Sequence, residues 1–311
     1  MDSLVLSGRL GTALTETESI MTSSVTRIDP RTFGPWAIVT GASSGIGKEF
    51  ARQLATSGLH VVLVARRLSA LEELGGRLTT EFGVQYRAVG VDLTEEHFLG
   101  KLEEATHDLD IGLVVSNAEM WMLGDFVTMD ERILQRSLRL NVEAHLDVAH
   151  HFGQYLARRR RGGLLLTAST AGLQGIPFSA EYAAAKAYVL ALGEGLHGEL
   201  QKVGVHVTVL LPGATDTPLL AASGFDLPAI LKPMSPEQCV AEGLAALNAN
   251  RATHIAGRMN RLLAALMPRR LATRMYGSLS AQVLAKRSGE AGAGERPALE
   301  QRARDEQGES E

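Results

Sequence analysis

The chain lacks the features that mark secreted and membrane proteins. Its 311 residues include a single cysteine, Cys239, which excludes an intramolecular disulfide. No stretch approaches the ~20 consecutive apolar residues that a membrane span needs. The first residues have neither the basic start nor the apolar core of a signal peptide. We therefore expect a reduced, soluble, cytoplasmic protein.

A surplus of positive charge is also absent. The formal net charge is −4, and residues 288–311 alone carry three basic and seven acidic residues, a balance of −4. The rest of the chain is therefore close to neutral, and we expect no nucleic-acid partner.

Metal-site patterns are missing as well. His145, His150 and His151 fall on one predicted helix, but no acidic or cysteine partner stands at ligand spacing, so we expect no metal. Four arginines at 158–161 precede two glycines. Cations complement the dipole at a helix C-terminus and glycines end helices, so this run is interpreted as an ordinary helix end.

Short apolar runs, rich in valine and leucine, recur along the chain. Such runs are typical of parallel strands that are buried on both faces. After a first run that begins at Trp36, we predict strands at 60–65, 86–91, 111–116, 163–169 and 205–211, with 253–257 as a candidate last strand.

Helical patterns separate these strands, at 45–57, 68–82, 95–106, 130–160, 180–203 and 235–249. This alternation predicts an α/β fold: a Rossmann-type doubly wound parallel sheet of about seven strands, flanked by helices, in a single domain.

A glycine-rich turn follows the first strand. Residues 36–47 read WAIVTGASSGIG and lead into an amphipathic helix. At such a helix N-terminus, free backbone N–H groups and the helix dipole attract a pyrophosphate, and glycines allow it to approach. The spacing Gly-x-x-x-Gly-x-Gly differs from the commoner dinucleotide fingerprint. The context still predicts a dinucleotide site.

The end of the second strand indicates which dinucleotide is bound. NAD-selective sites place an acidic residue here, whereas this chain has Arg66 and Arg67. A guanidinium can pair with a 2′-phosphate in a bidentate way. We predict NADP(H), with Arg66 as the main contact and Arg67 stacking on adenine; the alternative is a solvated charge pair.

Tyr182 and Lys186 lie four residues apart in a helical pattern, with Ser169 thirteen residues upstream. Residues at this spacing share one helix face. An ammonium beside a phenol favours the phenolate and lowers the phenol's pKa. Tyr182 is therefore a candidate acid or base near neutral pH.

Together these motifs resemble the classical short-chain dehydrogenase/reductase family, loosely closest to its hydroxysteroid and 3-ketoacyl reductase branch. The match runs from about Trp36 to Pro218. Besides Arg66 and Arg67, the cofactor-binding residues that we predict are Gly41, Ser43, Ser44, Gly45, Ile46, Gly47, Asp92, Leu93, Asn117, Ala118, Tyr182, Lys186, Pro212, Gly213, Thr215 and Thr217.

The resemblance also implies catalytic roles. Asn141, Ser169, Tyr182 and Lys186 match the family's catalytic set. It implies that Lys186 binds the nicotinamide ribose, that Asn141 holds a relay water, and that the protein is a homodimer or homotetramer through helices 130–160 and 180–203.

The substrate is expected to be hydrophobic. An apolar run from Met120 to Leu123 follows the fourth strand, and residues 217–236 have the character of a mobile lid. We predict that Met120 contacts the substrate together with Ser169 and Tyr182. These features favour a steroid-like or fatty-acyl ketone or secondary alcohol; the alternative is plain packing under the lid.

Two positions depart from the family's Asn-Asn-Ala-Gly segment, with Ser116 for the first Asn and Glu119 for the Gly. Glycine there avoids placing a side chain against the cofactor. Glu119 could turn outward harmlessly, contact the substrate or the lid, or weaken NADP(H) binding. We favour an outward turn toward the pocket mouth, so that the enzyme stays active with an altered entrance.

We predict a flexible extension at 1–33, the catalytic domain at 34–259, an amphipathic helical extension at 260–287 and a disordered acidic tail at 288–311. Residues 260–287 combine leucines with arginines. Such a helix more often packs on its own domain or a partner subunit than on an anionic membrane surface. The rival to the enzyme is a non-catalytic NADP(H)-binding sensor or scaffold.

Overall fold

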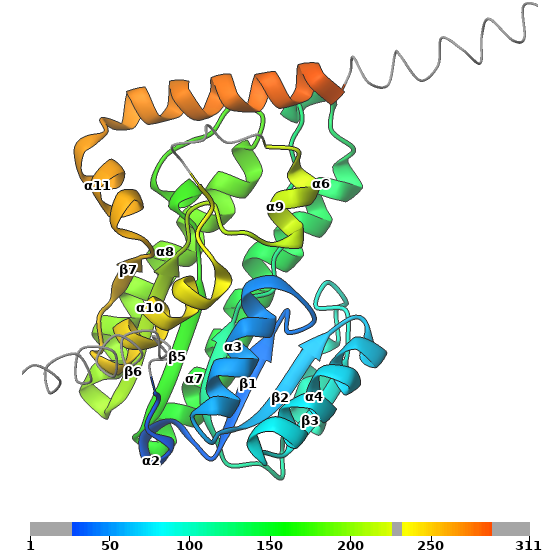
Figure 1. The fold of residues 1–311 in the computed structure, drawn as a ribbon, viewed down its shortest axis with the longest axis vertical. Coiled ribbons are helices and arrows are strands. Elements are labelled where there is room, and N and C mark those ends of the chain that lie inside the picture. Colours follow the sequence, from blue (N-terminus) through cyan, green and yellow to red (C-terminus); the bar gives the residue numbers. More distant parts are fainter. Residues whose placement is uncertain (1–26, 226–231, 288–311) are drawn as a thin grey trace, which may run out of the picture.

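The computed structural model describes residues 27–225 and 232–287. Its strands are β1 (Trp36–Thr40), β2 (His60–Ala65), β3 (Tyr86–Gly90), β4 (Ile111–Ser116), β5 (Gly162–Thr167), β6 (Val205–Leu211) and β7 (Thr253–Ile255). They form one parallel sheet with the order β3-β2-β1-β4-β5-β6-β7 (Figure 1). The predicted doubly wound sheet is confirmed. The winding reverses between β1 and β4, and ligands of such sheets bind at this point.

Helices connect and cover the strands. They are α2 (Pro30–Phe33), α3 (Gly45–Thr56), α4 (Leu68–Phe82), α5 (Phe98–Glu104), α6 (Glu131–Leu138), α7 (Ala144–Arg159), α8 (Ala180–Leu200), α9 (Pro218–Ser223), α10 (Pro236–Asn248) and α11 (Arg258–Leu266). Short 3₁₀ turns lie at η1 (Phe126–Thr128), η3 (Thr170–Leu173) and η4 (Gln201–Val203).

The core has two parts, one on each face of the sheet. Phe50 of α3 and Leu71 of α4 belong to the first part, to which α10 also contributes. Phe152 of α7 and Val189 of α8 belong to the second, with α5. Because helices cover both faces, the strands are apolar along almost their whole length, which is why they could be recognised in the sequence.

The long helix predicted over 130–160 is interrupted. A π-helical turn, η2 (Arg139–Glu143), separates α6 from α7. Asn141 lies in this turn and is fully buried. Its side chain accepts a hydrogen bond from the Met120 backbone N–H at 3.0 Å and donates one to the Met120 carbonyl at 2.8 Å. The wider turn thus fixes the loop that follows β4.

Residues 269–287 form a further helix, called here the roof helix, which lies with α11 above the carboxyl ends of the strands (Figure 1). Its Arg287 donates hydrogen bonds to the carbonyls of Ala222 and Ser223 at the end of α9, at 3.0 and 2.8 Å. Its Gly277 packs against Pro177 so closely that an added Cβ would lie 2.8 Å from the proline ring. The C-terminal extension therefore packs on its own domain.

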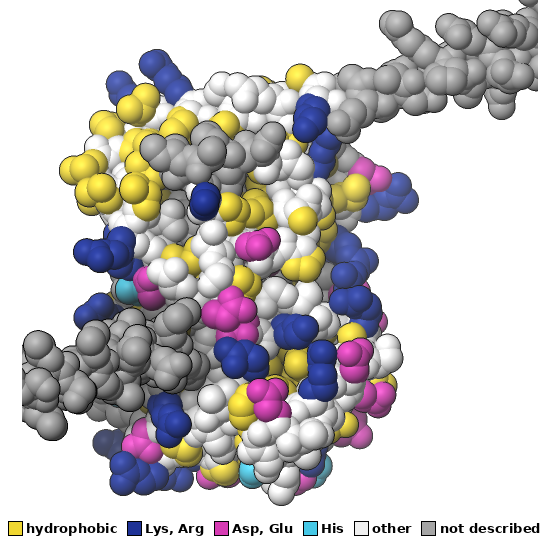
Figure 2. Space-filling model, viewed as in Figure 1, with side chains coloured by type: hydrophobic (Ala, Val, Ile, Leu, Met, Phe, Trp, Pro, Cys, Tyr) yellow, Lys and Arg dark blue, Asp and Glu magenta, His cyan; other side chains and the backbone are white. Residues whose placement is uncertain are grey.

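The cover carries exposed apolar residues as well as exposed arginines. Leu262, Leu266 and Leu271 are among the exposed large hydrophobic residues, and hydrophobic side chains gather over α11 in Figure 2. Within residues 27–225 and 232–287, no helix combines the length and apolar character that crossing a bilayer requires.

The folded domain starts earlier than expected. Ile28 and Phe33 are buried, and α2 packs beside β4 and β5. The predicted boundary at residue 34 is therefore wrong, because 27–33 contribute to the core. The rest of the predicted extension and the tail at 288–311 lie outside the described residues.

Candidate active site

The glycine-rich turn lies between β1 and α3, at the carboxyl edge of the sheet. Gly41 and Gly45 have φ values of +70° and +53°, which favour glycine. A Cβ added to Gly41 would lie 3.0 Å from the Cα of Ala118, and one added to Gly45 would lie 3.2 Å from a methyl of Thr217. The Ser44 side chain makes no capping bond to α3. The turn therefore meets the loops that follow β4 and β6 and keeps its first helical amides for a ligand.

Asn117 and Ala118 are held by Thr40, the last residue of β1. The Thr40 hydroxyl accepts hydrogen bonds from the backbone N–H groups of Asn117 and Ala118, at 2.8 and 3.0 Å. The Asn117 side chain donates to the Thr40 carbonyl at 3.3 Å. The ends of β1 and β4 are locked together beneath the predicted cofactor site.

Arg66 and Arg67 leave the end of β2 and are exposed. Next to them, Leu93 is buried and Asp92 follows β3. Burial acts to raise the pKa of Asp92, but hydrogen bonds from Thr94 and the charges of Arg136 and Arg66 outweigh it and lower that pKa. The charge of Arg66 therefore reaches the Asp92 carboxylate. These two predicted cofactor-binding residues lie at the same edge of the sheet.

Tyr182, Lys186 and Glu119 form one cluster. Lys186 is fully buried, and its ammonium donates to the Thr167 carbonyl at 3.1 Å. One oxygen of the Glu119 carboxylate, Oε2, lies 2.6 Å from Lys186 Nζ and accepts a hydrogen bond from the Tyr182 hydroxyl at 3.0 Å. The expected outward turn of Glu119 is therefore wrong: its carboxylate points at the Tyr–Lys pair, where an ammonium and a phenol both favour it.

The expected lowering of the Tyr182 pKa by Lys186 is also wrong in this arrangement. Burial, followed by the charge of Glu119 and the hydrogen bond to it, raises the pKa of Tyr182 well above its ordinary value. Ser169 opposes this change and lies close enough to act on the phenol. Spacing along the helix predicted the lysine but not the carboxylate that neutralises it.

Ser169 follows β5 and faces a large cavity. Its hydroxyl accepts a hydrogen bond from the Ala171 N–H at 3.1 Å and donates to the Pro212 carbonyl at 3.4 Å. The cavity has a volume of about 630 Å³. Ser169 and Tyr182 lie on its wall with Ile46, Pro212, Gly213, Thr215 and Thr217. Other predicted cofactor-binding residues lie at the ends of β1 and β4, beside β5 in the sheet. The predicted cofactor site therefore adjoins the cavity.

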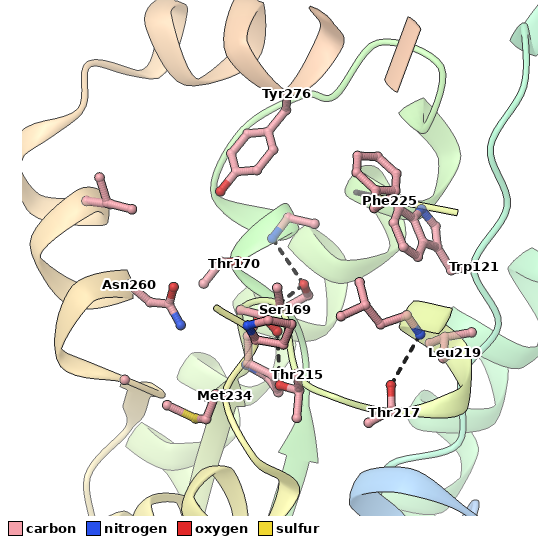
Figure 3. Close-up of a pocket in the computed structure, with 18 of the residues that line it drawn as sticks. Trp121, Ser169, Thr170, Thr215, Thr217, Leu219, Phe225, Met234, Asn260 and Tyr276 are labelled. Atoms are coloured by element: carbon pink, nitrogen blue, oxygen red, sulfur yellow. Dashed lines mark hydrogen bonds between the residues drawn. The ribbon is translucent and has the colours of Figure 1, made fainter. Parts of the chain in front are cut away.

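Apolar residues from the loop after β4 and from the predicted lid line the cavity (Figure 3). Trp121 stacks on Phe225 at a ring distance of 5.0 Å and lies 5.8 Å from the Tyr182 ring. The predicted lid contributes Leu219, Leu220, Phe225 and Met234, although residues 226–231 lie outside the described part.

Met120 does not belong to the group of described residues that line the cavity. The cavity lining therefore gives no support to the prediction that Met120 contacts the substrate, which stays a prediction. Its backbone is bonded to Asn141, and the next residue, Trp121, reaches the wall instead, where its indole N–H donates to Ser179 at 2.6 Å.

Sequence reasoning missed the part of the site that α11 and the roof helix supply. Their lining residues are Arg258, Met259, Asn260, Leu263, Met275, Tyr276, Leu279 and Ser280. Of these, Asn260 and Tyr276 are visible at the edge of the cavity in Figure 3. The spacing of Met275, Tyr276 and Leu279 was a signal of a buried face, but it did not say what that face covers. Among the described residues, no group of three or more His, Cys, Asp or Glu could hold a metal ion.

Comparison with known proteins agrees with this geometry. The profile of the short chain dehydrogenase family matches residues 35–226. The chain belongs to the short-chain dehydrogenase/reductase family. It is 36% identical to a 7beta-hydroxysteroid dehydrogenase of Clostridium sardiniense over 230 residues, which cover 74% of this chain and 88% of that protein.

Solved structures of family members are similar too. One, described in work on 7beta-hydroxysteroid dehydrogenase stereoselectivity, has a TM-score of 0.75 and 28% identity, and the match covers 80% of this chain and 98% of that one. A short-chain dehydrogenase from Sphingobium yanoikuyae in complex with NADPH has a TM-score of 0.67 and 32% identity, with 71% and 87% covered. The predicted hydroxysteroid-like branch of the family is confirmed.

As a member of this family the chain is an oxidoreductase, and the similar enzyme from Sphingobium yanoikuyae was solved with NADPH. The residues present suit that cofactor. The glycine cradle admits no Cβ at Gly41 without a close contact, the α3 amides carry no side-chain cap, and Arg66 offers a cation beyond β2.

Proposed function

We propose that the enzyme interconverts a ketone and a secondary alcohol on a hydrophobic substrate, steroid-like or fatty-acyl, with Tyr182 as the acid and base. The observation that carries this proposal is the largely apolar cavity of about 630 Å³ with Ser169 and Tyr182 on its wall. This volume lies in the range of pockets that bury a whole small molecule.

Each residue has a defined task in the reductive direction. The chemistry that NADPH would supply when bound is hydride transfer to the carbonyl carbon of the substrate. Tyr182 donates its proton to the oxygen of that carbonyl, and Ser169 donates a hydrogen bond to the same oxygen. Lys186, held by Thr167, would hold the nicotinamide ribose, and Asn141 would support the water path that returns a proton to Tyr182.

Steroid-like substrates are favoured over small polar ones by the walls of the cavity. Trp121, Phe225, Leu263 and Leu279 give an extended apolar lining. Polar side chains, among them Ser169, Tyr182 and Asn260, lie between these apolar surfaces and can orient a substrate. The similar 7beta-hydroxysteroid dehydrogenase supports the same class.

A second candidate function is a non-catalytic NADP(H) sensor or scaffold. The pairing of Glu119 with Lys186 favours it, because a carboxylate occupies the lysine that should serve the cofactor. An intact Ser169–Tyr182–Lys186 set favours the enzyme, since a sensor needs no proton donor.

One experiment separates the two. NADPH oxidation is followed with a panel of steroid ketones, 3-ketoacyl thioesters and small polar ketones, and NADPH binding is measured in parallel. We expect turnover with members of the first two classes and little with the third. Tight NADPH binding without turnover on any ketone would support the sensor.

We also propose a homo-oligomer that assembles through α7 and α8, whose Leu146 and Tyr188 are exposed hydrophobic residues, and a location in the cytoplasm. Cell fractionation tests the location.

A further inference from the structure

Glu119 stands between the two side chains on which the proposed chemistry depends. Its Oε2 atom is shared by the Lys186 ammonium, at 2.6 Å, and the Tyr182 hydroxyl, at 3.0 Å. Lys186 is fully buried and Tyr182 is 8% exposed, while the Glu119 side chain is 19% exposed and lines the cavity. The carboxylate is therefore the most exposed member of the cluster.

This placement changes what the lysine does to the tyrosine. An ammonium without a partner favours a neighbouring phenolate. Here the carboxylate neutralises the ammonium and accepts the phenol's proton in a hydrogen bond, which requires the phenol to keep that proton. Ionised Tyr182 would place two negative oxygens 3.0 Å apart in a buried site.

Other charged groups near Tyr182 act from a greater distance or are neutral. Glu181 on α8 acts on Tyr182 through its charge, but its carboxylate accepts a hydrogen bond from Ser137 at 2.6 Å. His145 on α7 faces Lys186; burial, followed by the lysine charge, lowers its pKa to about 3, so it is neutral. Lys232 and Arg258 line the cavity and are exposed. Among the described residues, Glu119 is the acidic group bonded to the phenol.

We infer that Glu119 is a positioning residue that keeps Tyr182 protonated and so prepares the site for ketone reduction. The inference rests on the proposed function and adds its direction. In reduction, the Tyr182 O–H bond breaks as its proton forms the new O–H bond of the alcohol, and the water path at Asn141 returns a proton from solvent to the phenolate. In oxidation, the phenolate must form first, which the carboxylate opposes. Glu119 does not change the overall equilibrium of the reaction. It changes the pH range in which each direction is fast.

The direct test is a spectroscopic titration of tyrosine ionisation in the cofactor-free protein, with the same titration of a Tyr182→Phe background subtracted. Glu119→Gln keeps the shape of the side chain and removes its charge. The matched control is Glu181→Gln, which removes an equal charge that is not bonded to the phenol. We expect Tyr182 to ionise at least about one pH unit lower in Glu119→Gln, a tenfold change in ionisation constant. In Glu181→Gln the midpoint of the Tyr182 titration should shift much less.

A second variant keeps the inference testable if Glu119→Gln does not fold. Glu119→Gly removes the side chain altogether and should shift the titration in the same direction, with thermal unfolding as the check on folding. With NADP(H) and a substrate, both variants should move the rising limb of alcohol oxidation and the falling limb of ketone reduction to lower pH.

Two results would overturn the inference: a Tyr182 titration that is the same in wild type and both Glu119 variants, or limbs of the pH profiles that stay in place. An unchanged titration with a gain of more than about tenfold in NADPH affinity would show that Glu119 competes with the cofactor instead. Because the titration needs neither substrate nor turnover, inactivity on every ketone would refute the proposed function and leave this result readable.

Discussion

Arg66 and Arg67 have equal charge, but the sequence assigns them different tasks. Both are exposed at the carboxyl end of β2, and Arg66 is close enough to Asp92 to act on its pKa. Arg67 is the residue that precedes α4, and its side chain makes no capping bond to that helix. The preference for NADP(H) over NAD(H) should therefore depend mainly on one guanidinium.

Replacing Arg66 with Asp should move cofactor preference toward NADH, because a carboxylate repels a 2′-phosphate. Loss of a charged hydrogen-bond partner costs about 1.5–3 kcal/mol, or ~10–100-fold in the ratio of dissociation constants. Fluorescence titration with NADPH and NADH measures this ratio. Arg67→Asp is the control and should change it less. An unaltered ratio in Arg66→Asp would remove Arg66 from this role.

At the scale of elements, a network around Glu242 attaches the cover of the cavity to the sheet. Glu242 of α10 accepts hydrogen bonds from His254 of β7 at 2.9 Å, the Gly257 N–H at 3.0 Å and Arg261 of α11 at 2.7 Å. Burial acts to raise its pKa, but these bonds lower the pKa of Glu242 from 4.5 to about 2.

Glu242→Gln should destabilise the fold by about 2 kcal/mol at neutral pH, the cost of losing hydrogen bonds to a charged group. A carboxyl whose folded pKa is lowered stabilises the fold above its unfolded pKa, and this contribution is lost as pH falls toward the folded value. The difference in unfolding free energy between wild type and variant should therefore shrink as the pH falls from 4.5 to about 2. Denaturant unfolding across this window checks it, with Glu237→Gln as control. A gap that does not depend on pH would contradict the assignment.

The helices and strands were largely predictable, because burial and backbone conformation restrict which residues can form them. Buried parallel strands must be apolar on both faces, and glycine is needed where φ is positive, as at Gly41 and Gly45. The π-helical turn at Asn141 could not be predicted, because one extra residue in a helical turn barely changes the apolar pattern.

Contacts between distant segments were less predictable. A loop of a few residues decides whether Met120 or Trp121 reaches the cavity, and the orientation of Glu119 depends on a lysine 67 residues later in the chain. The apolar stripe of residues 260–287 indicated a packing face but not the cavity that it covers.

For the whole molecule, two exposed apolar surfaces compete as the site of self-association. One lies on α7 and α8, with Leu146 and Tyr188 each 39% exposed. The other is the outer face of α11, with Leu262 and Leu266. The resemblance to the family selects the first.

We predict that the wild-type protein is a dimer or tetramer at micromolar concentration, and that Leu146→Glu with Tyr188→Glu yields smaller species because it buries like charges in the interface. Leu262→Glu is the control on the other surface and should leave assembly intact. Light scattering after gel filtration measures each mass. A monomeric wild type, or dissociation by Leu262→Glu alone, would place the prediction in error.

The central claim is that Tyr182 supplies the proton for reduction of a hydrophobic ketone in the covered cavity. Its most direct test is NADPH consumption with a steroid ketone by wild type and Tyr182→Phe, with NADPH affinity measured on both. We predict that the variant loses ~10²–10⁴-fold in kcat, while its NADPH dissociation constant stays within about threefold. Near-wild-type turnover in Tyr182→Phe would contradict the account.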